Sequence, residues 1–151
     1  NEGVHSGMSG GVIPSSFRIQ RMLLNRVEDS DTGKILIPEM HVEISEKVRN
    51  EAEELASLLG DEIWSQLPVV ETLKPQNEGA AEILLDMNWR PAMSVIGADG
   101  MPPTQTAVNV LRTHTDLKLS FRIPPGVPSE NIVSSLKETG ERDPPSGSTV
   151  E

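Results

Sequence analysis

The sequence predicts an α+β fold, in which an antiparallel β-sheet is covered on one face by α-helices. Two observations lead to this expectation. In the first part of the chain apolar side chains recur at helical spacing, whereas between residues 92 and 123 they alternate with polar ones at the spacing of β-strands. The 151 residues, of which 36% are hydrophobic and 24% charged, are enough for one domain with its own core.

Four main helices are predicted from apolar stripes and from the residues at their ends. They span residues 14–27, 45–60, 77–87 and 129–140. Ser45, Asn77 and Ser129 are favourable N-caps, and Gly60 and Gly140 are favourable terminators. The second helix falls within residues 39–76, which we interpret as an insertion between the first helix and the sheet.

Three strands and the start of a fourth are predicted in the second half of the chain. They cover residues 92–96, 106–111, 117–123 and 149–150. In the third, four apolar side chains alternate with Lys118, Ser120 and Arg122, so that one strand face is apolar and the other polar. This order of elements predicts a ferredoxin-like two-layer sandwich with a helical insertion.

The composition excludes several classes of function. A formal charge of −10, with acidic residues spread along the chain, repels nucleic-acid backbones and anionic membranes. Because Cys is absent, disulfides, thiolate metal sites and cysteine nucleophiles are excluded, and a cytoplasmic location is expected. The sequence begins without Met on a functional-looking loop, so we expect residues 1–151 to be a single domain cut from a longer protein.

Three histidines, His5, His41 and His114, are the side chains best suited to proton transfer or metal binding near neutral pH. His114 and Asp116 have a spacing that can hold a metal, but no further ligand accompanies them at metal-site spacing. His41 stands between two apolar residues, where a packing or surface role is expected. We therefore expect no metal site within this chain.

His5 lies in a segment of a different kind. Residues 3–11, GVHSGMSGG, place one imidazole among glycines, which allow a backbone to approach a ligand closely. The same composition is typical of an exposed, flexible loop. Composition and spacing alone therefore predict an α+β domain and leave the role of His5 open.

Three segments, in order along the chain, resemble the lid domain of the carnosinase-like dipeptidases, in the M20 family of zinc peptidases and deacylases. The first is His-Ser-Gly-x-x-Gly-Gly at His5–Gly11, followed by an amphipathic helix. The second is Gly-Ala-Asp-Gly at residues 97–100 and then Asn-Val-Leu at residues 109–111, similar to the family's Asn-Val-Ile-Pro. The third is Leu-Ser-Phe-Arg-Ile-Pro-Pro-Gly-Val at residues 119–127, similar to Ser-Phe-Arg-Leu-Pro-Pro.

This resemblance implies a homodimeric dipeptidase in which a separate catalytic domain holds two zinc ions and the general base. His5 then corresponds to the histidine that the lid lends to the partner subunit's active site, where it stabilises an oxyanion in trans. Asn109 corresponds to a residue that contacts the substrate, and Arg122 to an arginine that binds the substrate's carboxylate. The chain by itself is expected to be inactive.

Two departures from the family pattern bear on these expectations. Arg112 stands where the family usually has Pro, and the strand that normally precedes the His-Ser-Gly loop is missing. Asn109 and Arg122 are also consistent with solvated positions on polar strand faces. A second function of a different class stays open as well, namely a free-standing ferredoxin-like module that dimerises and binds a small regulatory ligand.

Overall fold

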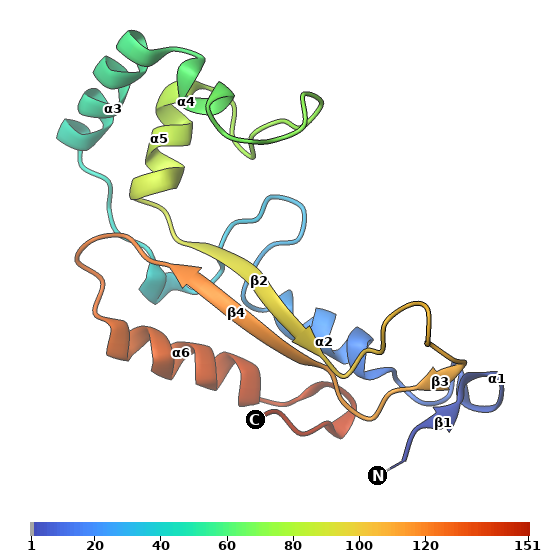
Figure 1. Ribbon diagram of the computed structural model, residues 1–151. Coiled ribbons are helices and arrows are strands. Elements are labelled where there is room, and N and C mark those ends of the chain that lie inside the picture. Colours follow the sequence, from blue (N-terminus) through green and yellow to red (C-terminus); the bar gives the residue numbers. More distant parts are fainter. Residues whose placement is uncertain (1) are drawn as a thin grey trace.

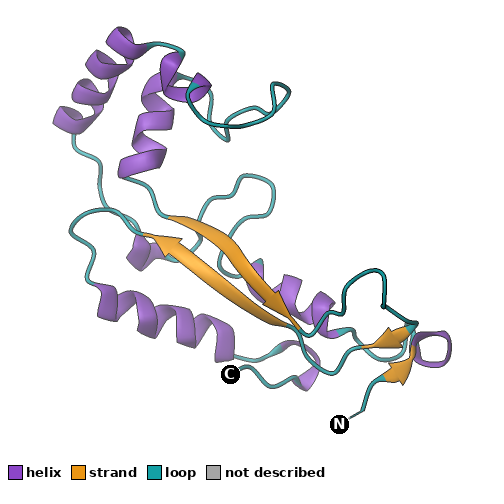
Figure 2. Ribbon diagram, in the orientation of Figure 1, coloured by secondary structure: helices purple, strands orange, loops and turns teal. Residues whose placement is uncertain are grey.

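The computed structural model describes residues 2–151 and has the α+β fold that the sequence predicts. Its centre is a long antiparallel ribbon of β2 (Ala92–Asp99) and β4 (Asp116–Arg122) (Figure 1). A helical arm extends from one end of this ribbon. A second small sheet, of β1 (Val4–His5) and β3 (Val110–Leu111), lies at the other end (Figure 2). The molecule is therefore elongated, with the His5 loop and the arm far apart.

The ribbon separates an apolar face from a polar one, as the alternation in the sequence predicts. Cross-strand pairs such as Met93–Phe121 lie on one face, and pairs such as Ser94–Ser120 on the other. A β-bulge after Val95 shifts the register by one residue and lets β2 continue past the glycine at which the sequence predicted its end. The polar face also carries the exposed end of β4.

The core lies between the apolar face of the ribbon and two other segments. These are α6 (Ser129–Glu141) and residues 27–40, which include the 3₁₀ helix η1 (Pro38–Met40). The buried members of this core are Val27, Ile35, Ile37, Met40 and Ile132. Phe121 is the one aromatic side chain packed against them, so the core is aliphatic, as the low aromatic content predicts.

Helix α2 (Ser16–Leu24) begins where the sequence predicts. The Ser15 hydroxyl accepts a hydrogen bond from the Arg18 N–H at 3.2 Å, which satisfies one of the free donors of the first turn. None of the residues of α2 is buried, and Phe17 and Met22 are 46% and 49% exposed. Much of its apolar stripe is therefore open to solvent.

Arg26 joins the chain that follows α2 to the end of α6. Its guanidinium donates hydrogen bonds to three backbone carbonyls, those of Thr139, Arg142 and Asp143, at 3.3, 2.6 and 2.8 Å. These carbonyls belong to the last turn of α6 and the residues after it, where a positive charge is favourable. Arg26 is therefore a structural clamp rather than a free cation.

The helical arm consists of α4 (Glu62–Ser65) packed with two longer helices, α3 (Glu46–Leu59) and α5 (Ala80–Asn88). The ends of α3 are as predicted, with Ser45 as N-cap and Gly60, at φ 53°, as C-cap. The arm has a small core of its own, made of Ala52, Ile63 and Leu85. Within residues 2–151 no helix is both long and apolar enough to cross a membrane.

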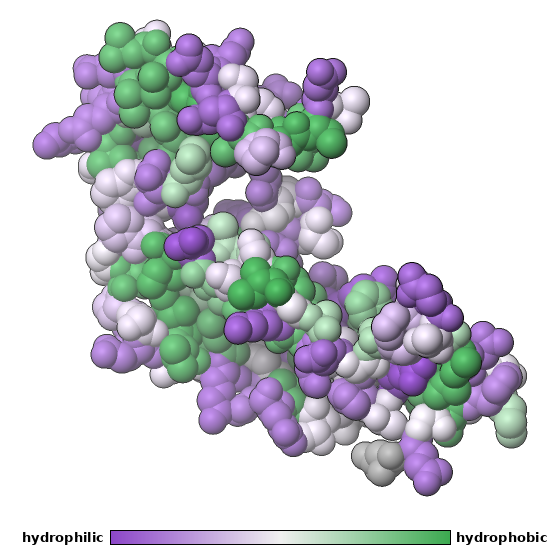
Figure 3. Space-filling model, viewed as in Figure 1, coloured by the Kyte–Doolittle hydropathy of each residue, from purple (hydrophilic) through white to green (hydrophobic). Residues whose placement is uncertain are grey.

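The arm carries most of the negative charge of the protein. Residues 46–88, which form the arm, contain ten acidic and three basic side chains, whereas the rest of the chain contains thirteen and ten. Acidic residues also occur along the rest of the chain, where basic residues nearly balance them. The arm also exposes apolar groups, as Figure 3 shows, with Leu58 82% and Val70 69% exposed.

The prediction of a three-stranded sheet is wrong. Residues 106–109 belong to no strand, and the Thr106 N–H bonds the Pro103 carbonyl at 2.9 Å and closes a turn. The remaining strand, β3, pairs with β1 instead of joining the ribbon, so the structure has two two-stranded sheets. Residues 149–150, expected to begin a strand, are not extended into one.

The ends of three helices also differ from the prediction. Helix α2, expected to reach residue 27, ends at Leu24. Helix α5 begins at Ala80 and not next to Asn77, because the Asn77 amide donates to the Asp86 carboxylate at 2.8 Å instead of capping the helix. Helix α6 includes Ser129 as its first residue and continues past Gly140 to Glu141. These differences shift the ends of the helices without changing their order.

Candidate functional site

The short β1–β3 ladder brings His5 and Asn109 together, although they are far apart in the sequence. His5 pairs with Val110, and the Ser6 N–H donates to the Asn109 carbonyl at 2.9 Å. Both site residues are exposed. β1 belongs to the His-Ser-Gly segment itself and lies outside the β2–β4 ribbon.

The His5 ring is held by the backbone of its own loop. Its Nδ1 accepts a hydrogen bond from the Gly7 N–H at 3.1 Å, at the start of the one-turn helix α1 (Ser6–Ser9). An accepting Nδ1 presents its lone pair, so the ring proton lies on Nε2. A Cβ on Gly7 would lie 3.0 Å from His5 Cε1, so a larger residue there would press on the ring. The loop therefore presents an exposed Nε2–H donor.

Arg122 lies at the opposite end of the ribbon from His5 and Asn109 (Figure 1). It is the last residue of β4, where it pairs with Ala92 at the start of β2 and is exposed on the polar face. Six residue steps at the rise of a strand place it about 20 Å from Asp116, at the end nearer β3. The three candidate residues therefore form two separate groups within one chain.

The other two histidines make local contacts. His41 Nε2 lies 2.7 Å from the Ile35 carbonyl, which agrees with a packing role. His114 is exposed, with its Nε2 3.9 Å from an Asp116 carboxylate oxygen. No group of three or more His, Asp or Glu side chains comes together anywhere in residues 2–151 in a way that could hold a metal ion.

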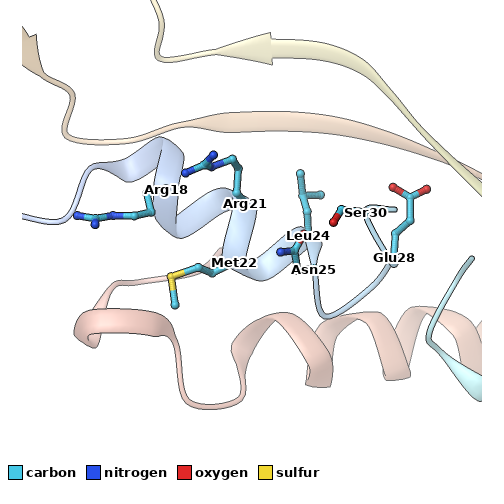
Figure 4. A pocket seen from close by; sticks show the side chains of 7 residues that line it. All are labelled: Arg18, Arg21, Met22, Leu24, Asn25, Glu28 and Ser30. Carbon is cyan, nitrogen blue, oxygen red and sulfur yellow. The ribbon is translucent and has the colours of Figure 1, made fainter. Parts of the chain in front are cut away.

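A groove of about 650 Å³ along α2 was not anticipated from the sequence. Its charged side chains include Arg18, Arg21 and Glu28 (Figure 4). The spacing of residues 18, 21, 22 and 25 places them on one helix face and is the signal that could have revealed it.

Comparisons with known proteins agree with the resemblance found in the sequence. No protein-family model and no curated protein sequence matches the chain. Among solved structures, human carnosine dipeptidase 1 is similar over 93% of the chain, with a TM-score of 0.70 and 23% identity. The dipeptidase Dug1p from Saccharomyces cerevisiae is similar over 91%, with a TM-score of 0.64 and 26% identity. Sso-CP2, an M20 family metallo-carboxypeptidase from Sulfolobus solfataricus, is similar over 92%, with a TM-score of 0.64 and 18% identity.

The fold is that of a domain-sized segment of M20 metallopeptidases, and the predicted resemblance to this family is confirmed. Two of these three neighbours are dipeptidases. The chain spans 30%, 28% and 36% of the length of the three proteins.

Proposed function

We propose that residues 1–151 are the dimerisation, or lid, domain of a larger zinc-dependent dipeptidase, to which they contribute substrate-binding and oxyanion-stabilising side chains. The observation that carries this proposal is the match of more than nine-tenths of the chain to under a third of two dipeptidases. The ordered set of motifs around His5, Asn109 and Arg122 supports it independently.

The residues of this chain form no site for the zinc ions that the resemblance implies. The part of the chain that the structure describes brings together no set of His, Asp and Glu side chains suited to zinc. We therefore assign the metal to a catalytic domain outside residues 1–151 and expect the isolated chain not to hydrolyse peptides. Because that domain would hydrolyse an amide bond, the residues of this chain have to bind the substrate and stabilise the oxyanion.

His5 is suited to stabilise the oxyanion of the tetrahedral intermediate in amide hydrolysis. Negative charge develops on the former carbonyl oxygen, and a positioned N–H donor lowers the barrier. The Gly7 N–H holds His5 Nδ1, so that Nε2–H is the available donor. With its Nδ1 lone pair engaged, His5 acts as a donor and not as the general base.

The separation of the site residues supports a role in trans. Two residues of extended peptide span only about 7 Å, so one bound dipeptide does not reach from His5 to Arg122 of the same chain. In a homodimer, His5 and Asn109 therefore serve one active site and Arg122 the other. Each site is then completed by two subunits, with Arg122 binding the substrate carboxylate and Asn109 contacting the substrate.

The homodimer is supported by the open edges of the ribbon. Within residues 2–151, β2 and β4 pair only with each other, so each has a second edge able to accept another strand. Val95 and Ile96, next to the bulge, are 49% and 59% exposed. A cytoplasmic location stays part of this proposal as a prediction.

The test is His5→Ala in the full-length parent enzyme. Loss of one oxyanion donor is expected to lower turnover by about two to three orders of magnitude, with zinc content unchanged. His114→Ala, which removes another exposed histidine, is the matched control and should keep nearly full turnover. Mixing the His5 variant with a variant inactive in its catalytic domain should restore part of the activity in hybrid dimers. Full turnover of His5→Ala, or no recovery in hybrids despite subunit exchange, contradicts the role in trans.

A further inference from the structure

A small cavity lies in the helical arm, where the end of α3 and the starts of α4 and α5 come together (Figure 1). Its volume is about 210 Å³. We call it the Trp64 cavity, and its lining includes Gly60, Asp61, Trp64, Glu78, Gly79 and Ile83. Gly60 and Gly79 both have positive φ, and a Cβ added to either glycine would meet no other atom within 4 Å. The space beside these two glycines is therefore open.

The walls of the Trp64 cavity combine an aromatic side chain with two carboxylates. Trp64 is half-buried and borders the cavity, whereas Ile63 and Leu85 in the core of the arm are each 2% exposed. Asp61 stands at the N-cap of α4, yet its side chain accepts no hydrogen bond from the backbone there. Asp61 and Glu78 are exposed, and neither makes an ion pair within residues 2–151. Both carboxylates are therefore available to a ligand.

The charge around the Trp64 cavity favours a cationic ligand. None of the residues that line the cavity is basic. Lys74 precedes Pro75, which lines the cavity, but Lys74 makes no ion pair in the part of the chain that the structure describes. The arm has ten acidic and three basic side chains, so its field attracts cations and repels anions. The cavity therefore has a negative wall and no positive group of its own to balance it.

The chemistry of the walls suits an organic cation better than a metal ion. Within residues 2–151 no three His, Asp or Glu side chains gather closely enough to hold a metal, and Ca²⁺ and Mg²⁺ take about six oxygen ligands or more. The face of a Trp ring attracts an ammonium group, and Ile83 adds an apolar wall for its carbon atoms. Cavities for drug-sized ligands have volumes of about 300–1,000 Å³. The smaller Trp64 cavity is therefore suited to a single head group.

We propose that the Trp64 cavity is a binding site for an alkylammonium group, carried by a free amine or by a lysine side chain of another protein. The cation lies against the Trp64 ring, and its carbon atoms contact Ile83. The carboxylates of Asp61 and Glu78 neutralise its charge. Because the arm extends from the end of the ribbon opposite the His5 loop, this site is separate from His5 within one chain (Figure 1). It gives the arm a binding function of its own, beyond the proposed role in peptide hydrolysis.

The test is a titration of the ¹⁵N-labelled chain followed in ¹H–¹⁵N correlation spectra. The probes are tetramethylammonium chloride and Nα-acetyl-lysine amide, with sodium chloride at equal ionic strength as the blank. Both probes should produce saturable shifts of the Gly60 and Gly79 amides and the Trp64 indole N–H, with a Kd of roughly 1 mM, and no shift at Gly7. tert-Butanol, a neutral molecule similar in shape to tetramethylammonium, should produce none. Tighter binding of tetramethylammonium indicates a free amine as the ligand, and tighter binding of the lysine derivative indicates a protein side chain.

Variants assign the binding to the walls of the cavity. Trp64→Leu keeps an apolar side chain but removes the aromatic face, and should raise the Kd about tenfold. Asp61→Asn combined with Glu78→Gln should raise it about tenfold or more, and since both positions are exposed the fold is kept. Glu53→Gln combined with Glu54→Gln removes the same charge from exposed positions on α3 that do not line the cavity. This matched control should leave the Kd within about twofold.

The pattern across probes and variants decides the proposal. Weaker binding in the Trp64 variant and in the cavity double variant, but not in the α3 control, supports the site. The site is overturned if neither probe produces saturable shifts, or if tert-butanol or sodium chloride produces the same shifts. An equal loss in the α3 control overturns it too, because the arm then attracts cations only through its overall charge. The same spectra show whether each variant is folded, and the lid assignment is tested separately by His5→Ala in the parent.

Discussion

Replacing Arg26 by Met should destabilise the domain by separating α6 from the chain that follows α2. The guanidinium makes three hydrogen bonds to carbonyls, at 3.3, 2.6 and 2.8 Å. Hydrogen bonds with a charged partner contribute about 1.5–3 kcal/mol each when buried. Here the site is half-exposed and water can replace part of them, so we expect a total loss of about 2–3 kcal/mol. The Met side chain keeps most of the apolar contact of the arginine stem.

Urea unfolding followed by far-ultraviolet circular dichroism measures this loss in the free energy of unfolding. A thermal melt should show a matching fall in Tm of roughly 4–12 °C for a domain of this size. Arg142→Met is the matched control, because only the backbone carbonyl of that residue takes part in the clamp, and it should change stability by at most about 0.5 kcal/mol. Arg26→Lys keeps the charge but not the planar fork, and should give an intermediate loss. Equal stability of the Arg26 and Arg142 variants would refute the clamp.

Two further predictions concern the core and the acid side of the stability profile. Met40→Ala removes a side chain that is 0% exposed and should cost about 2–5 kcal/mol in urea unfolding, whereas Met8→Ala, at an 86% exposed position, should cost almost nothing; equal losses would contradict the assigned core. Hydrogen bonds from the Thr32 hydroxyl and N–H hold the pKa of Asp29 below its ordinary value of 3.8. The stabilisation by the Asp29 carboxylate is therefore present above pH 3.8 and is lost as the pH falls through the lowered pKa. The difference in Tm between the wild type and Asp29→Asn should therefore narrow in acid, and a difference that widens there contradicts this sign.

Local patterns in the sequence predict the elements whose determinants are close in the chain. Ser15 and Ser45 cap their helices and Gly60 ends α3, because each acts on backbone groups within one turn. The alternation in β4 predicts which side of the ribbon is apolar. Asn77 fails as a predicted cap because a tertiary partner, Asp86, competes for its side chain.

Properties that depend on distant contacts were not predictable in the same way. The pairing of β1 with β3 joins segments that are far apart in the sequence, and no local pattern at Val4 distinguishes it from a loop residue. For the candidate site, the motif resemblance identified His5, Asn109 and Arg122 as a set. Only the structure shows that the first two are neighbours and that the third lies at the far end of the ribbon.

The two-pair ladder between β1 and β3 also determines the order in which parts of this domain gain and lose structure. Val4 and Leu111 are 107 positions apart, so we expect β1 to attach after the ribbon and the helices have folded. Two residue pairs and one further bond from Ser6 hold it, whereas the core elements share a continuous buried cluster. Amide hydrogens of the His5 segment should thus exchange with solvent through a local opening that leaves the core folded. His5 leaves and regains its position on a timescale set by this opening, independently of global unfolding.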